Sequence, residues 1–424
     1  MTGVIEQLLS QVPIPNVVPV RQEFDRPRVE DVTKEVVEQL RRSGILSGLG
    51  TGARVAVTAG SRGIANLPEI VAAAVGEIRN SGAVPFIIPA MGSHGGATAE
   101  GQRAMLEGLG ITEASVGAPV ESWMEVIEIG RTADGLPVAI DRNAAAADAV
   151  LILNRVKPHV AYRGRYESGL LKMLAIGLGK QRGAQTCHDL GFGRMADNVE
   201  AIARVVLASG RILGAVAILE NAYHETARIE TMPAQDIPDR EPELLNEARR
   251  LMPRLYIDTI DVLVIDRIGK DISGTGFDTN VVGRYHTPYA SGGPDVTRLV
   301  ILDLTDVSHG NANGVGIGDF TTERLFRKMS FENTYPNSLT STVPISVKLP
   351  MVLPNDRLAI QAGIRTCNVA DKRSVRLVRI RDTQSVGSIS VSENLAPAVN
   401  AHDRMRVTGA SGPLRFDSAG ALLP

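Results

Sequence analysis

Hydrophobic runs alternate with glycine-rich turns in the first part of the chain, and the period of the pattern changes after each turn. A β-branched run over Arg54–Thr58 is followed by a turn and by helical spacing over Leu67–Ile78. A second unit repeats this order, with a strand over Val84–Pro89 and a helix over Ala99–Leu109, for which Thr98 is the expected N-cap. Two consecutive strand–loop–helix units predict a parallel sheet.

The loops after these two strands hold the first candidate site residues. Arg62 lies in the turn after the first strand, and His94 lies in the glycine-rich loop after the second. Because ligands bind at the carboxyl ends of parallel strands, we expect both side chains at one functional edge. A guanidinium beside helix N-terminal amides suits a carboxylate or a phosphate, and the amides of Gly95 and Gly96 with the Thr98 hydroxyl are also available to an anion.

The rest of the chain predicts two domains. Residues 1–240 are expected to form an N-terminal domain and residues 241–424 a C-terminal α/β domain, because a proline- and charge-rich stretch over 233–242 has the composition of a linker. The expected fold class is α/β, with two α/β domains, mainly parallel sheets and an active-site cleft between the domains. Further expected elements are strands over 149–153, 212–219, 261–266, 299–302, 375–380 and 388–391, and helices over 168–178, 195–208, 242–251 and 319–329.

Composition narrows the possible functions. A formal net charge of -2 supplies no basic field for nucleic acid, and two cysteines cannot make a disulfide framework or a four-cysteine zinc site. No apolar run is long enough to span a membrane, and the first twenty residues lack a secretory signal, so a cytoplasmic protein is expected. The abundance of glycine, 42 residues, favours tight turns around small polar ligands.

Three of the seven histidines and one lysine are candidates for chemistry. His94, His159 and His188 lie in polar or glycine-flanked segments, and their spacing does not match a helix-borne zinc motif. Lys172 lies in an apolar stretch, where desolvation favours the neutral, nucleophilic amine. The alternative is that its stem lies along an apolar helix face and its ammonium reaches water.

Taken together, these motifs resemble the nickel-dependent lactate racemase family. The resemblance rests, in order along the chain, on Gly92-Ser93-His94 before Thr98 and Glu100, on Pro158-His159, on Gly169-Leu170-Leu171-Lys172 and on His188. It implies a nickel-pincer nucleotide, the nickel complex of pyridinium-3,5-bisthiocarboxylic acid mononucleotide, covalently attached at Lys172. It also implies that His188, sixteen residues further on, ligates the nickel.

The resemblance further implies a racemase or epimerase of a small 2-hydroxy acid. His94 and His159 would exchange the hydroxyl proton on opposite faces of the substrate while hydride moves to the cofactor and back, so that configuration inverts. Arg62 and Lys270 would bind the substrate carboxylate, and Thr98, Gly95 and Gly96 would contact the cofactor. The implied partners are the enzymes that build the cofactor, and a homo-oligomer is expected.

Two departures from the family pattern keep other functions open. Ala59 stands where the family has an aspartate, and the second-domain glutamine and lysine of the family have no clear match, Lys270 being a better substitute than Arg284 or Lys328. One alternative is a lyase or oxidoreductase in which Lys172 forms a Schiff base. The other is a paralogue that binds the nucleotide without turnover.

Overall fold

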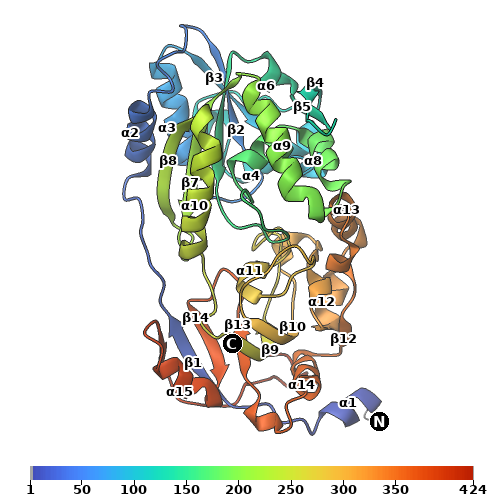
Figure 1. Cartoon of the computed structure of the whole chain (residues 1–424). Coiled ribbons are helices and arrows are strands. Elements are labelled where there is room, and N and C mark those ends of the chain that lie inside the picture. Colours follow the sequence, from blue (N-terminus) through green and yellow to red (C-terminus); the bar gives the residue numbers. More distant parts are fainter. Residues whose placement is uncertain (1–2, 424) are drawn as a thin grey trace. The chain divides into compact units, whose positions relative to one another are not determined.

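The chain divides into two compact units in the computed structural model, which describes residues 3–423 (Figure 1). Residues 25–252 form one unit, and the preceding segment joins residues 253–424 in the other. The expected boundary at residue 240 falls inside helix α10 (Ile237–Leu251), so the division comes after that helix. The expectation of a linker over 233–242 is therefore wrong. Pro238 lies in the first turn of α10, where its missing N–H breaks no helical hydrogen bond.

A five-stranded sheet forms the centre of the unit 25–252. Its strands follow the order β3-β2-β6-β7-β8, and only the β7–β8 pair is antiparallel. The strands are β2 (Arg54–Ala59), β3 (Val84–Pro89), β6 (Ala149–Arg155), β7 (Ile212–Glu220) and β8 (Thr226–Pro233). Four of them were expected from their apolar runs. β8 was missed because its polar and apolar residues alternate on an edge.

Helices cover both faces of this sheet. The chain moves from β2 to β3 through α3 and from β6 to β7 through α9, and these two crossovers run in opposite directions along the sheet. Right-handed crossovers place the two helices on opposite faces, and Figure 1 shows α2 and α3 on one side of the sheet and α8 and α9 on the other. The helices are α2 (Val32–Ser43), α3 (Leu67–Asn80), α4 (Ala99–Gly108), α5 (Glu113–Val116), α6 (Arg142–Ala146), α7 (Leu170–Lys172), α8 (Lys180–His188), α9 (Met195–Ala208) and α10.

The apolar spacing explains this arrangement. Val32, Val36 and Leu40 recur at intervals of four and form the buried stripe of α2, and the fully buried Val55 and Val57 of β2 belong to the same hydrophobic core. A separate hairpin, β4 (Val126–Arg131) and β5 (Pro137–Asp141), completes the unit. The prediction of an α/β fold with a mainly parallel sheet is confirmed.

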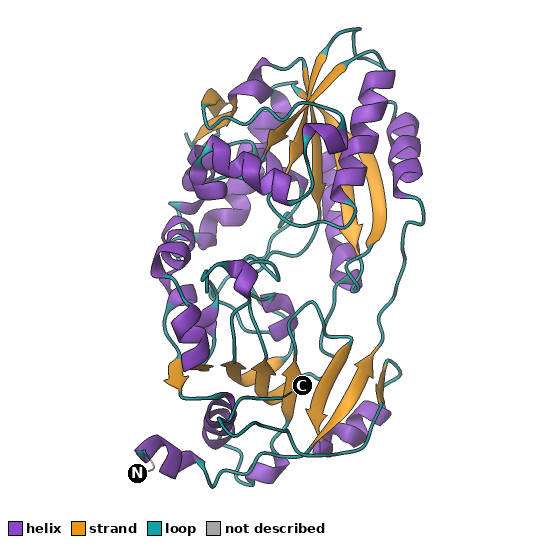
Figure 2. Ribbon diagram, turned by 180° about the vertical axis from the view of Figure 1, so that it is seen from behind, coloured by secondary structure: helices purple, strands orange, loops and turns teal. Residues whose placement is uncertain are grey.

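The second unit contains an eight-stranded mixed sheet, and Figure 2 shows the strands and helices of each unit. Its order is β12-β11-β10-β9-β13-β14-β1-β15, parallel from β12 to β13 and antiparallel beyond. The strands are β1 (Val17–Gln22), β9 (Thr259–Ile265), β10 (Asp295–Ile301), β11 (Phe320–Thr322), β12 (Met351–Leu353), β13 (Leu377–Ile380), β14 (Ser388–Ser392) and β15 (Met405–Val407). The helices are α1 (Val4–Leu9), α11 (Thr279–Val282), α12 (Glu323–Lys328), α13 (Phe331–Ser341), α14 (Asp356–Thr366) and α15 (Ala396–Asn400).

One helix of this unit is shorter than the sequence predicted. The helix expected over 319–329 is wrong in its first part, because Phe320–Thr322 pairs with β10 and β12 and only the following residues are helical. Among residues 3–423, no helix is long and apolar enough to cross a bilayer. The expected cleft between the domains stays a prediction.

Candidate active site

The candidate site lies at the point where the strand order of the five-stranded sheet reverses. β2 and β6 are neighbours in the sheet; from β2 the chain continues to β3 on one side, and from β6 it continues to β7 on the other side. Such a switch point leaves a crevice at the carboxyl ends of the two strands. Ser61 and Arg62 follow β2, and His159 follows β6, so the fold delivers these side chains to one crevice.

His94 is held from both sides of the loop that follows β3. The hydroxyl of Ser61 hydrogen-bonds to Nδ1 of His94, which joins the loops after β2 and β3. Gln102, fully buried on α4, donates its amide to the carbonyl oxygens of Gly92 at 2.8 Å and of His94 at 3.2 Å. The loop is therefore fixed at both its backbone and its ring. The sequence analysis missed Ser61, although its place beside Arg62 could have indicated it.

His159 and Lys172 form a direct pair. Nζ of Lys172 lies 2.8 Å from Nε2 of His159, and the backbone N–H of Ala161 donates to Nδ1 at 3.1 Å. Because Nδ1 accepts a hydrogen bond, the neutral ring carries its proton on Nε2. The Nε2–H group can then donate only to an amine that keeps its lone pair. This geometry fits a neutral Lys172.

The surroundings of Lys172 shift its protonation equilibrium toward the neutral amine. Burial is the main cause that lowers its pKa from 10.5 to about 8, and the positive charges of Arg62 and Lys157 lower it further, against a smaller effect of Cys187. The alternative that this lysine only extends a charged end to water is therefore not supported. Lys172 has the character of a nucleophile at a pH near neutrality.

The positive charge of Arg62 has no anionic partner among residues 3–423. Its guanidinium makes no hydrogen bond or ion pair with any of residues 3–423 that the structure records. Burial and the nearby charge of Arg155 lower the pKa of Arg62 to about 10, while Arg155 itself is ion-paired with Glu220. A partly buried guanidinium beside Lys172 is a site for a carboxylate or a phosphate.

A buried carboxylate holds the loop that carries His159. Glu167 is fully buried, and its Oε2 accepts the backbone N–H of His159 at 2.6 Å. Its Oε1 accepts from Arg249 at 2.6 Å, and Arg163 lies 3.5 Å from Oε2. Glu167 was not singled out in the sequence, because nothing local shows that an acid there will be buried and paired.

His188 lies in the same aromatic cluster as His159. The ring of Phe192 is 5.4 Å from the ring of His188 and 6.1 Å from that of His159, and Tyr162 packs 4.4 Å from His159. Burial, followed by the charge of Lys172, lowers the pKa of His188 to about 4, so the ring is neutral and able to ligate a metal. The neighbouring thiol of Cys187 is buried, and its pKa is raised to about 12, so it is not a thiolate ligand near pH 7.

Within residues 3–423, no group of three or more His, Cys, Asp or Glu side chains could hold a metal ion. A metal at His188 would therefore need most of its ligands from a bound cofactor. The donor set fits the nickel-pincer group in this respect, since that group brings its own sulfur and carbon ligands and the chain supplies one imidazole.

The expected anion contacts in the loop after β3 are only partly available. Thr98 is the N-cap of α4, as predicted, and its hydroxyl accepts the Gly101 N–H at 3.0 Å. Gly95 and Gly96 have φ values of +66° and +65°, a conformation that favours glycine. A Cβ at Gly95 would lie 2.6 Å from the backbone of α4, whereas Gly96 borders open space. Gly96 is thus better placed for a ligand than Gly95 or Thr98.

Lys180 forms a buried ion pair that supports the site. It is the first residue of α8, fully buried, and its ammonium lies 2.9 Å from Oδ2 of the equally buried Asp141. It also donates to Gln102 at 3.1 Å, so the ion pair supports the His94 loop through Gln102. Burial lowers the pKa of Lys180, against the opposing effect of Asp141.

The candidate cations of the second unit are all engaged within that unit. Lys270 donates to the carbonyl of Gly274 at 2.7 Å, inside its own loop. The guanidinium of Arg284 pairs with Asp319, and Lys328 pairs with Asp303 at 3.1 Å and Asp306 at 3.0 Å. Binding of substrate by Lys270 therefore stays a prediction.

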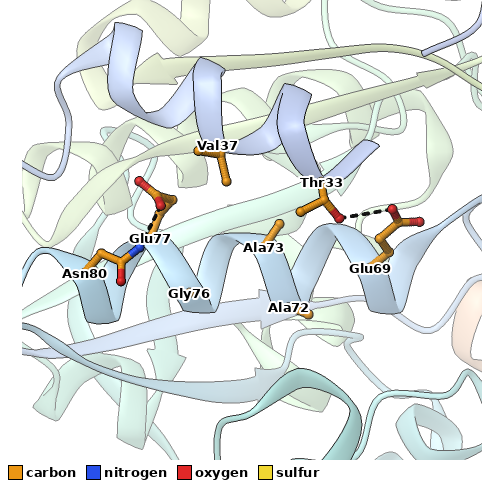
Figure 3. A pocket seen from close by; sticks show the side chains of 8 residues that line it. All are labelled: Thr33, Val37, Glu69, Ala72, Ala73, Gly76, Glu77 and Asn80. Carbon is orange, nitrogen blue, oxygen red and sulfur yellow. Dashed lines mark hydrogen bonds between the residues drawn. The ribbon is translucent and has the colours of Figure 1, made fainter. Parts of the chain in front are cut away.

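A shallow groove lies between α2 and α3, and Figure 3 shows its lining. Its polar groups satisfy each other: Thr33 donates to Glu69 at 3.1 Å, and Asn80 donates to Glu77 at 2.8 Å. It has no nucleophile or unpaired cation, so the chemistry of the unit lies at the switch point instead.

Comparison with known proteins connects part of this unit with a known family. Residues 27–198 match the family model described as the lactate racemase N-terminal domain, a range that includes all eight candidate residues from Arg62 to His188. Among solved structures, the fold is similar to that of the lactate racemase apoprotein from Thermoanaerobacterium thermosaccharolyticum. The TM-score is 0.51 at 12% sequence identity, over 87% of this chain and 99% of that chain, which at such identity shows the fold alone. No curated protein matches the sequence. The predicted resemblance to the lactate racemase family is confirmed by the family model over residues 27–198 and by the similar fold.

Proposed function

We propose that the protein is a racemase or epimerase of a small 2-hydroxy acid. The observation that carries the proposal is the Lys172 amine, with its pKa lowered to about 8, which lies 2.8 Å from Nε2 of His159 and beside the unpaired guanidinium of Arg62. The pair supplies a nucleophile for a covalent tether, and the guanidinium supplies the recognition of a carboxylate. The two histidines can exchange protons near neutral pH.

The residues fit the cofactor that the family resemblance implies. Lys172 would carry the nickel-pincer nucleotide, and the neutral ring of His188 would ligate its nickel. When bound, this group would accept the hydrogen of the substrate carbon as hydride and return it.

The side chains of this chain would then perform the remaining steps. Arg62 would orient the substrate through its carboxylate, and His94 or His159 would take the hydroxyl proton as the carbon loses hydride. The other histidine would return a proton after the planar keto acid has been attacked on its second face. Ser61 and Gln102 would hold His94 for this task, and Glu167 would hold the backbone of His159.

The test is loss of turnover without loss of metal. His94→Ala and His159→Ala variants, loaded with cofactor, should no longer interconvert the enantiomers of any 2-hydroxy acid that the wild type racemises in a panel read by chiral chromatography. Their nickel content should equal that of the wild type. Loss of nickel in either variant would instead place that histidine among the metal ligands.

A Schiff-base enzyme is the second candidate, and the same observation favours it. A lysine with a pKa of about 8 can also attack a carbonyl substrate. Borohydride with a keto acid would then fix the substrate irreversibly on Lys172, and a mass increase on the lysine peptide would support this candidate. The racemase proposal predicts no such adduct.

A further inference from the structure

Glu241 on α10 is a buried acid for which the proposed chemistry has no use. It is fully buried, and Oε2 of its carboxyl accepts the backbone N–H of Leu171 at 2.8 Å. Oε1 has no hydrogen-bond partner within the described chain. The carboxyl of Glu241, seventy positions after Leu171 in the sequence, thus contacts the turn that carries Lys172.

The contact is close enough to require glycine at the start of that turn. A Cβ on Gly169 would lie 2.0 Å from Oε1 of Glu241 and 2.9 Å from its Cδ. The φ of Gly169 is -170°, which any residue can adopt, so the requirement comes from the approach of Glu241 and not from the backbone. Asn154 donates to the Gly169 carbonyl at 2.9 Å and fixes the same peptide from the end of β6.

The turn needs this support because it is short. Only Leu170–Lys172 is α-helical, and the next five residues, Met173–Gly177, form a π-helical segment. The first N–H groups of a helix have no partner inside the helix, and a carboxylate near them is stabilising. π segments of this kind are often found at functional sites.

Retaining an acid here has a cost for the fold. Burial raises the pKa of Glu241 to about 7, and hydrogen bonds from the backbone of Leu171 and Leu170 offset only part of that effect. The titratable groups facing it are Tyr162 and Tyr166, whose pKa values it raises, and neither is a cation. An apolar side chain would fill this place without the desolvation cost.

We propose that Glu241 is a positioning residue for Lys172, which closes the amino end of the lysine turn and thereby directs the amine toward His159. The inference rests on the proposed function only in the use made of Lys172. It predicts that loss of the carboxyl loosens the turn, separates Nζ from His159 and makes the amine less reactive.

The test uses the full chain without cofactor and two measurements on each variant. Residue-resolved hydrogen exchange reports the Leu171 amide, and acylation by an N-hydroxysuccinimide ester across a pH series reports Lys172. Glu241→Leu, which suits the buried surroundings, should exchange at Leu171 at least about tenfold faster and acylate Lys172 several-fold more slowly, with its pH profile moved upward. Glu241→Gln, which keeps an acceptor, should stay near the wild type in both.

Glu247→Gln is the matched control, because Glu247 lies on the same helix and pairs with Arg228 at 2.7 Å. It should change neither measurement. The groups that face Lys172 in the pH series are His159, Arg62, Lys157 and Cys187, and they are the same in every variant.

Wild-type exchange at Leu171 and a wild-type acylation profile in folded Glu241→Leu would overturn the proposal. If Glu241→Leu does not fold, Gly169→Ala replaces it in the test, since its methyl group would displace the carboxyl of Glu241. An unchanged Lys172 profile in Gly169→Ala would also overturn the proposal. Neither measurement depends on nickel or turnover, so failure here is distinct from failure of the proposed function.

Discussion

The protonation state of Lys172 gives the most quantitative prediction. With a pKa of about 8, about a quarter of the amine is neutral at pH 7.5, against about one part in a thousand for a lysine at 10.5, a difference of about 240-fold. Lys172 should therefore acylate with a midpoint near pH 8 in the chain without cofactor. The exposed Lys34, followed in the same digest by mass spectrometry, serves as reference.

The cause of the shift can be tested with Arg62→Gln. This variant removes the nearby positive charge that lowers the pKa, so the midpoint for Lys172 should rise, and the rate at pH 7.5 should fall severalfold. Burial, the larger cause, remains, so the midpoint should not reach 10.5. A wild-type midpoint at the ordinary value for lysine, or no change in the variant, would refute the assignment of a neutral amine.

Three further predictions concern the support of the site and its cost in stability. Ser61→Ala removes the partner of His94 Nδ1, so kcat should fall about ten- to hundredfold with KM nearly unchanged, whereas a kcat within about twofold would show that the hydroxyl does not orient the ring. Asp141→Asn leaves the buried Lys180 ammonium without its ion-pair partner, and urea denaturation should show a loss of about 3 kcal/mol or more; a loss below about 1 kcal/mol would contradict the buried pair. Lys172→Met removes a lysine whose pKa is lower in the folded chain than in the unfolded chain, so it should stabilise the fold by up to about 3 kcal/mol at pH 7. This gain should shrink from pH 8 to 10.5, because the wild-type lysine loses its proton first in the folded chain and then in the unfolded chain as well. A gain that does not change with pH would contradict the charge as its cause.

Local pattern was sufficient to predict the core of the first unit. The apolar runs at Val84–Pro89 and Met195–Ala208 correspond to β3 and α9 at the same bounds, and Thr98 is the N-cap of α4 as expected. These signals are local, because a buried strand needs a run of adjacent apolar residues and a capped helix needs a capping residue directly before its first turn. They also sufficed to predict that the loops of Arg62 and His94 follow neighbouring parallel strands at one sheet edge.

Long-range pairing could not be predicted in the same way. β1 joins the eight-stranded sheet, although 236 residues (23–258) separate it from β9 in the chain, because its partners β14 and β15 lie near the end of the sequence. Glu241 and Glu167 have the ordinary sequence surroundings of surface acids, and only the fold shows that both are buried against the site. The buried pair of Lys180 and Asp141 likewise joins residues of two different elements.

The measurement that tests the central claim most directly is the intact mass and nickel content of the purified chain after co-expression with enzymes that build the pincer nucleotide. The wild type should gain the mass of one nucleotide and carry close to one nickel per chain, and Lys172→Ala should gain neither. His188→Ala should keep the added mass and lose nickel, because it removes a ligand and not the tether. A wild-type chain that stays unmodified and free of nickel under these conditions would contradict the tethered-cofactor account and leave the Schiff-base function as the better explanation of a neutral Lys172.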